Sequence, residues 1–291
     1  MASTKQKWFV GCGVGCLVII AAVAVVVYFT VMKAKQVVKE FEKIETSQEQ
    51  VRERFGDGKD FCPALDGKIP AERIEAFLKA RDTAAEQRAK LAVTLDGFSD
   101  AMQKAADGRE DEVSGWEMFK SGMGFVPQLV KFMQARNEGF LAANISPGEY
   151  TYYYVITYYA WLQKPLEDGP GIQITGQGAH GGTGQQDPEV VKANRRRELA
   201  QMANRTLLPM MRCQLAAIGD PGGPGEVATW QAALNAEIIA LENDPRRIPW
   251  QEGVPPAVFL SLEPFRERLE TSYSPQCNPL EMGLSGKHSR H

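Results

Sequence analysis

The chain has 291 residues, of which 33 are basic and 36 acidic, and a formal net charge of −3 at pH 7. Charges of both signs are mixed along the sequence, so nucleic acid is not an expected partner. Residues 34–291, which follow an apolar N-terminal segment, are enough for one large domain or two small ones.

The first element is an uncharged run from Trp8 to Met32, preceded by a short basic leader at 1–7. As a helix rising about 1.5 Å per residue, the run would reach roughly 37 Å, more than the ~30 Å hydrocarbon core of a bilayer. A cleaved signal peptide has a shorter apolar stretch and a small-residue cleavage site, and neither is found here. The sequence therefore predicts a transmembrane helix at 8–33 that stays attached and lodged in the lipid bilayer.

Small residues give this predicted helix one face that another helix can approach closely. Gly11 and Gly15 form a G-x-x-x-G pair, and Ala22 continues the face. Such faces favour helix packing in membranes, although glycine is also common in membrane spans without that role. Lysines flank both ends of the span, so the positive-inside rule does not decide the topology. An anchor with a short basic leader usually keeps that leader in the cytoplasm, so we expect the main domain outside it.

Three cysteines lie beyond the apolar run, namely Cys62, Cys213 and Cys277. At most one intramolecular disulfide can form among them, and the sequence leaves its pairing open. An oxidising compartment is permitted by this count but is not required by it.

Beyond the membrane, apolar positions at heptad-like spacing predict a helical stalk at 34–56, which either docks on the chain's own domain or forms a dimeric coiled coil. A helical domain is expected at 57–284, followed by a flexible tail at 285–291. Its expected elements are a helix from Pro70 to Met102 broken or bent near Gly97, a helix over 113–143 kinked or split by its interior glycines and Pro127, a helix over 147–164, a glycine-rich loop at 168–187, helices over 188–218 and 227–242, and a last helix over 256–273 interrupted or started afresh at Pro264. Strand remains an alternative for 147–164, since its residues also favour sheets. The predicted fold class is mainly α, a transmembrane helix continuing into an extracytoplasmic helical bundle.

Aromatic residues are concentrated in the segment over 147–164. Six of the eight tyrosines fall within ten residues, and these are Tyr150, Tyr152, Tyr153, Tyr154, Tyr158 and Tyr159. On an α-helix, Tyr150, Tyr154, Tyr158 and Trp161 would lie on one stripe. Each buried hydroxyl needs a hydrogen-bond partner, whereas protein interfaces suit tyrosine well, so we predict that this stripe contacts another protein. A core helix and an aromatic ligand pocket are the alternatives.

Histidines are few and poorly placed for catalysis. His180 lies in the glycine-rich loop, and His288 and His291 lie in the C-terminal tail. Catalytic and metal-binding histidines are normally held on rigid elements. The sequence has no zinc-protease, nucleophile-elbow or Walker motif. The G-x-G-x-x-G at 176–181 lacks the strand and helix of a dinucleotide site. The prediction is no enzyme, no cofactor and no metal.

Two segments resemble known proteins. "DGKIPAERIEAFLKARD" (Asp66 to Asp82) and "RERLETSYSPQCNPLEM" near the C-terminus resemble parts of uncharacterised bacterial cell-envelope proteins. The resemblance implies a bacterial, membrane-tethered, mainly helical protein of unassigned activity, and it transfers no functional residues.

Together these features predict a non-catalytic, single-pass protein of the bacterial inner membrane with a periplasmic domain. Its expected role is that of an accessory subunit that stabilises a larger membrane complex, for example a respiratory or photosynthetic one. The alternative is a membrane-tethered binder of a small or lipidic ligand in the cell envelope.

Overall fold

The computed structural model describes residues 44–56, 61–106, 115–170, 174–175, 178–179, 188–219 and 225–282. The chain divides into two compact units, Met1–Thr46 and Ser47–His291. The second unit is mainly helical, as the sequence predicts.

Several predictions concern residues outside the described ranges. They are the leader at 1–7, the transmembrane helix at 8–33 with Gly11, Gly15 and Ala22, and the tail at 285–291. Within the described ranges, no helix combines the length and the apolar character that crossing a bilayer requires.

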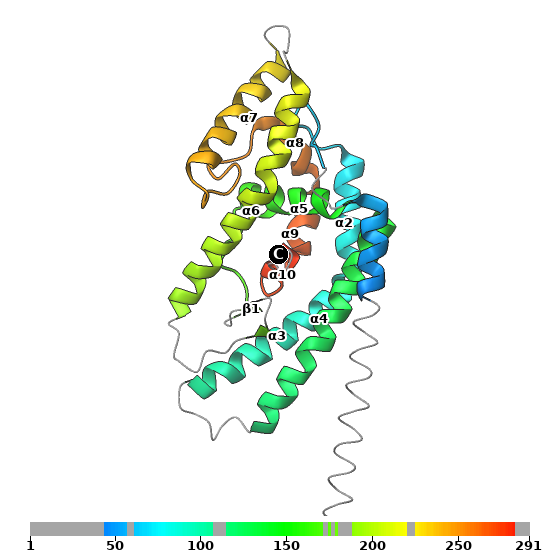
Figure 1. The fold of residues 1–291 in the computed structure, drawn as a ribbon, viewed down its shortest axis with the longest axis vertical. Helices are drawn as coiled ribbons and strands as arrows, with labels where there is room; N and C mark the ends of the chain where they lie inside the picture. Colours follow the sequence, from blue (N-terminus) through cyan, green and yellow to red (C-terminus); the bar gives the residue numbers. More distant parts are fainter. Residues whose placement is uncertain are drawn as a thin grey trace, which may run out of the picture. The chain divides into compact units, whose positions relative to one another are not determined.

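The helices follow one another along the chain (Figure 1). After a helical segment at 44–55, the elements are α2 (Ala71–Thr83), α3 (Ala85–Ala106), α4 (Gly115–Ala143), α5 (Pro147–Tyr154), the π-helix η2 (Val155–Trp161), β1 (Ile174–Thr175), β2 (Gly178–Ala179), α6 (Pro188–Ile218), α7 (Glu226–Asn243), α8 (Pro256–Leu262), the 3₁₀ turn η3 (Glu263–Phe265), α9 (Arg266–Ser272) and α10 (Asn278–Glu281). The two short strands pair antiparallel, with Ile174 opposite Ala179.

Two helix boundaries differ from the sequence-based expectation. The long helix after Pro70 breaks at Ala84, whereas α3 runs through Gly97 without interruption. At this break, the Arg88 side chain and the backbone N–H of Ala84 both donate to the carbonyl of Arg81, in the last turn of α2. Pro127 does not split α4, because packing against α2 and α3 outweighs the hydrogen bond that proline removes.

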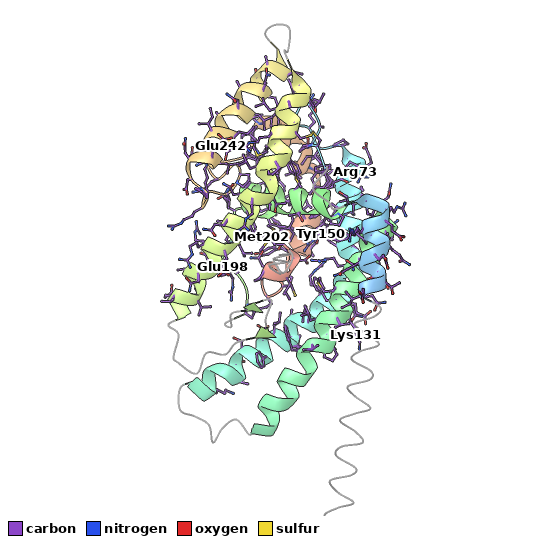
Figure 2. The ribbon with its side chains drawn as sticks, viewed as in Figure 1. Arg73, Lys131, Tyr150, Glu198, Met202 and Glu242 are labelled. Carbon is purple, nitrogen blue, oxygen red and sulfur yellow. A yellow bond between two sulfur atoms is a disulfide. The ribbon has the colours of Figure 1, made fainter. Side chains whose placement is uncertain are left out.

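The core lies between closely packed helices. Helix α4 lies against both α2 and α3, and α6 lies against α7 (Figure 1). At Gly139 the backbones of α4 and α2 approach so closely that a Cβ atom would lie 2.6 Å from the carbonyl oxygen of Ala80. Side chains fill the interior, with Tyr150 inside the domain and Glu242 on the outside of α7 (Figure 2).

One disulfide ties the segment before α2 to α6. It joins Cys62 to Cys213, whose Cα atoms lie 5.6 Å apart, and Cys277 is a free, buried thiol. The pairing that the sequence left open is therefore Cys62 with Cys213.

The described end of the predicted stalk packs on the domain. Val51 is buried in the main core with an exposed fraction of 6%, and Phe55 packs beside it. The side-chain amide of Asn137 donates to the hydroxyl of Ser47 at 3.0 Å. For residues 47–55, these contacts favour docking on the chain's own domain over a dimeric coiled coil.

Candidate functional site

The tyrosine-rich segment is helical, which rejects the strand alternative. Ser146 caps α5 by accepting from the backbone N–H of Glu149 at 3.1 Å, and Pro147 occupies the first turn. From Val155 the helix widens into the π-helix η2, which ends at Trp161. A π turn holds more residues than an α turn, so the spacing of side chains around the axis changes within this segment.

The predicted interaction stripe lies inside the protein. Tyr150 has an exposed fraction of 1%, and Tyr154 and Tyr158 have exposed fractions of 0%. Their rings pack on one another, with 4.7 Å between the ring centroids of Tyr154 and Tyr158. The prediction that these three tyrosines contact another protein is therefore wrong, and the core-helix alternative describes them. Trp161 is partly exposed and packs against Phe259.

Four of these tyrosines can be buried because their hydroxyls find partners on α9 and α10, and they are Tyr150, Tyr154, Tyr158 and Tyr159. The Tyr154 and Tyr159 hydroxyls both donate to the side-chain oxygen of Asn278, at 2.8 and 2.9 Å. The Tyr158 and Ser272 hydroxyls share a hydrogen bond of 2.6 Å. These partners lie more than a hundred positions along the chain, so the sequence near the tyrosines gives no sign of them.

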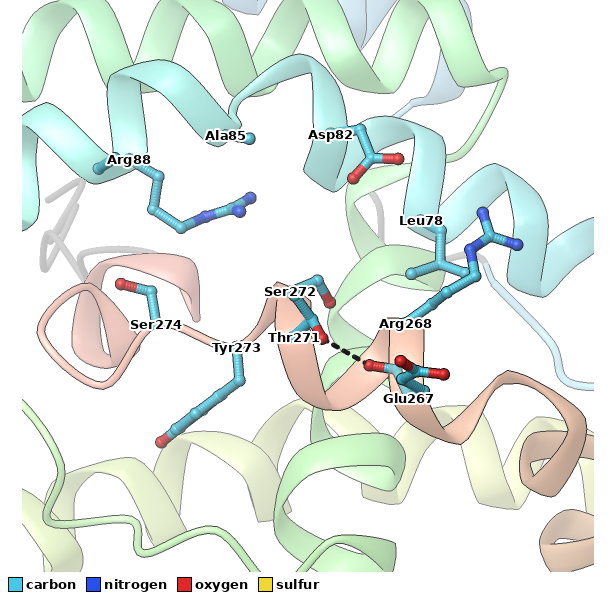
Figure 3. Close-up of a pocket in the computed structure, with 11 residues that line it drawn as sticks. Leu78, Asp82, Ala85, Arg88, Glu267, Arg268, Thr271, Ser272, Tyr273 and Ser274 are labelled. Carbon is cyan, nitrogen blue, oxygen red and sulfur yellow. Dashed lines mark hydrogen bonds between the residues drawn. The ribbon is translucent and has the colours of Figure 1, made fainter.

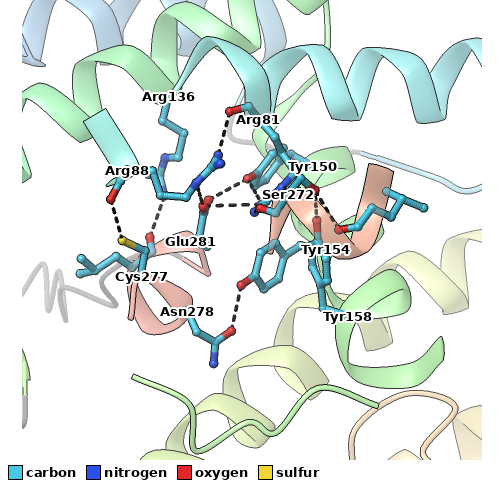
Figure 4. A network of polar contacts seen from close by, with 12 residues as sticks. Arg81, Arg88, Arg136, Tyr150, Tyr154, Tyr158, Ser272, Cys277, Asn278 and Glu281 are labelled. Atoms are coloured by element: carbon cyan, nitrogen blue, oxygen red, sulfur yellow. Dashed lines mark hydrogen bonds and ion pairs between the residues drawn. The ribbon is translucent and has the colours of Figure 1, made fainter. Parts of the chain in front are cut away.

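A buried carboxylate, Glu281, lies at the centre of this polar network (Figure 4). It accepts from Arg88 Nε at 2.6 Å and from the Tyr150 hydroxyl at 2.7 Å, and it lies 3.5 Å from Arg81 Nη1. Arg81 is fully buried and donates to Tyr150 and to Ser272.

The network holds more positive than negative charge. The guanidinium groups of Arg81 and Arg88 contact the single carboxylate of Glu281, and the charge of Arg136 also acts on it. Backbone carbonyls near helix C-termini provide further compensation, since Arg88 donates to Arg81 O, Arg81 to Ser272 O and Arg136 to Leu280 O. The Arg81 guanidinium also lies over the ring of Tyr158, 4.9 Å from its centroid.

Three buried groups of this region, Glu281, Tyr150 and Cys277, have pKa values shifted far from neutral pH. Burial alone would raise the pKa of Glu281, but the charges of Arg88 and Arg81 outweigh it and lower this pKa to about 2. Burial raises the pKa of the Tyr150 hydroxyl and raises that of the Cys277 thiol to about 12. None of these three groups titrates near neutral pH, as would suit a general acid or base. The network is therefore best explained as a structural centre.

A cleft of about 660 Å³ opens beside the network (Figure 3). Its polar lining comes from the end of α2, the start of α3, α9 and the segment after it, and includes Asp82, Arg88, Glu267, Arg268, Thr271 and Ser274. Arg88 belongs to both the network and the cleft. Ligand pockets commonly have volumes of about 300–1,000 Å³, so the cleft is the candidate binding site of the described domain.

The structure adds no support for histidine or metal chemistry. His180, His288 and His291 lie outside the described residues. Among the side chains that the structure does describe, no group of three His, Cys, Asp or Glu residues is placed to hold a metal ion. Comparison with protein-family models, curated proteins and solved structures finds no match.

The sequence-based reasoning missed the charged centre of the network. Arg81, Ser272, Asn278 and Glu281 were not singled out, because arginine and glutamate on amphipathic helices usually lie at the surface.

Proposed function

We propose that the chain is a single-pass protein of the bacterial inner membrane whose helical domain lies in the periplasm. Its role in this proposal is that of a non-catalytic accessory subunit of a larger membrane complex. The segment 8–33, which is uncharged from Trp8 to Met32, supplies the anchor. The Cys62–Cys213 disulfide supports the location, because disulfides persist in oxidising compartments.

An apolar surface on α8 is the observation that carries the binding role. Phe259 and Leu260 have exposed fractions of 40% and 70%, and Phe259 contacts the partly exposed Trp161. Adjacent large apolar side chains at a surface are typical of protein contacts. This α8 surface, made of Trp161, Phe259 and Leu260, suits an apolar face of another subunit held in the same membrane. We propose this surface as the protein contact instead of the tyrosine stripe, which is buried in the core.

Co-purification tests this function. The full chain is extracted from its native membrane in a mild detergent, and stoichiometric partners are identified by mass spectrometry. Replacing Phe259 and Leu260 by serine should release the partner. Replacing Val93 by serine is the control, since Val93 is 73% exposed on α3, a helix that lies apart from α8 (Figure 1). A partner that stays bound to the α8 variant would reject this surface, and the absence of any stoichiometric partner would reject the subunit role.

A second candidate function is that of a membrane-tethered binder of a small or lipidic ligand. The cleft beside Arg88 is the observation that favours it. The two functions use different surfaces of the domain, so separate variants can test them.

A further inference from the structure

The floor of the cleft carries a guanidinium that the buried network holds in place. Arg88 Nε binds Glu281, and its Nη2 binds the carbonyl of Arg81 at 2.9 Å. The side chain is only 7% exposed, yet it lines the cleft, and Figure 3 shows its guanidinium directed between α3 and the segment 272–274. A fixed, weakly solvated guanidinium is well suited to bind a carboxylate or a phosphate.

The charge beneath the floor strengthens this preference for an anion. Arg81 and Arg136 lie near the same carboxylate as Arg88, so the single negative charge of Glu281 is shared among three positive ones. Because the surroundings are buried, electrostatic attraction is less screened there than at an open surface.

The exposed part of the cleft has the opposite charge. Asp82 on α2 and Glu267 on α9 are exposed residues of its lining, and within the described part of the chain neither forms a salt bridge. Arg268, the other arginine of the lining, is held by both carboxylate oxygens of Glu75 at 2.6 and 2.9 Å. The charge of Asp82 also interacts with that of Arg268. Asp82 and Glu267 therefore add negative charge to the exposed lining, or rim, of the cleft, which can attract an ammonium group.

We infer that the cleft binds a small zwitterion, with its anionic group at Arg88 and its ammonium group at Asp82 and Glu267. This inference rests on the second proposed function, the tethered ligand binder. The cleft volume of about 660 Å³ accommodates a molecule of dipeptide size. Two sources share this chemistry, namely free amino acids or short peptides, and the phosphoethanolamine headgroup of a membrane lipid.

Calorimetric titration of the full chain in mild detergent tests the charge preference. The probes are dialanine and O-phosphoethanolamine, with N-acetyl-dialanine, which lacks the ammonium, and dialanine amide, which lacks the carboxylate. At least one of the two zwitterions should bind. If dialanine binds, its affinity should be at least about tenfold higher than that of either singly charged analogue. Binding of dialanine identifies the peptide class, and binding of O-phosphoethanolamine alone identifies the headgroup.

Variants at the rim leave the buried network intact. Asp82→Asn combined with Glu267→Gln should lower the affinity for the zwitterion about tenfold and leave that for N-acetyl-dialanine unchanged. Glu72→Gln, an exposed carboxylate on α2 outside the cleft lining, should change neither affinity. Rim variants that bind the zwitterion as well as the wild type would overturn the assignment of the ammonium site.

A native mass spectrum of the purified chain separates failure of the inference from failure of the function. A bound molecule with a single type of charge, together with no zwitterion binding, would overturn the inference and keep the ligand-binding function. No bound molecule and no titration with any probe would overturn both.

Discussion

Glu281 offers a direct test of what holds the helical domain together. Glu281→Gln keeps the size of the side chain and removes its charge. The wild-type carboxylate is 1% exposed and pairs with Arg88 at 2.6 Å and with Arg81 at 3.5 Å. Without it, two buried guanidinium groups lose their counter-ion. Breaking a buried pair by removing one partner costs about 3–5 kcal/mol, and we expect a loss of unfolding free energy of that size.

Urea unfolding of the full chain in mild detergent measures this loss. Trp230 and Trp250 are buried, with exposed fractions of 4% and 5%, so tryptophan fluorescence reports on unfolding of the core. Glu75→Gln is the matched control, because the same substitution there removes an exposed ion pair with Arg268. Exposed pairs contribute at most about 1 kcal/mol. If Glu281→Gln cost no more than this control, the buried charges would not be the structural centre inferred above.

Three further predictions concern a cross-link, a helix contact and pH. Replacing Cys62 and Cys213 by serine should lower the free energy of unfolding by up to about 5 kcal/mol, because the disulfide closes a loop spanning 151 positions. An unfolding midpoint that changes neither with this substitution nor with added reductant would contradict the prediction. Gly139→Ala should destabilise the domain by about 1–3 kcal/mol, since the added Cβ would lie 2.6 Å from the backbone of α2. Gly97→Ala should stabilise it by up to about 1 kcal/mol, because the Cβ there faces open space. Thermal unfolding of both variants measures the difference. The folded pKa of Glu281 is about 2, below its ordinary 4.5, so the ionised carboxylate should contribute about 3 kcal/mol to the free energy of unfolding. This contribution should be complete above pH 5 and should decline as the pH falls towards 2. Acid titration of Glu281→Gln should lack this decline.

Local sequence signals predicted the helices that have clear breakers. Helix α6 spans Pro188–Ile218 and α7 spans Glu226–Asn243, close to the expected ranges, because proline and glycine mark their ends. The interruption at Pro264 is also present, as the turn η3. The break at Ala84 was not predictable in this way, since neither proline nor glycine lies there, and the Arg88 side chain that binds the exposed carbonyl of Arg81 is positioned only in the folded core.

The network was harder to predict because its pairs are distant in sequence. Tyr150 and Glu281 are 131 positions apart, and Tyr154 and Asn278 are 124 apart. Local reasoning found too few partners to bury the tyrosines and therefore assigned them to the surface. The π-helix also changes the spacing that placed Tyr158 on the same stripe as Tyr154, and no residue pattern known to us marks it.

The order of the chain has a consequence for biogenesis. Ser272, Asn278 and Glu281, which complete the hydrogen bonds of the tyrosine helix, all belong to the final part of the described sequence. Because synthesis starts at the N-terminus, the chain cannot complete these hydrogen bonds until its last segment has been made. A chain that terminates before Ser272 would leave buried tyrosine hydroxyls without their partners, so we expect it to be unstable and readily degraded.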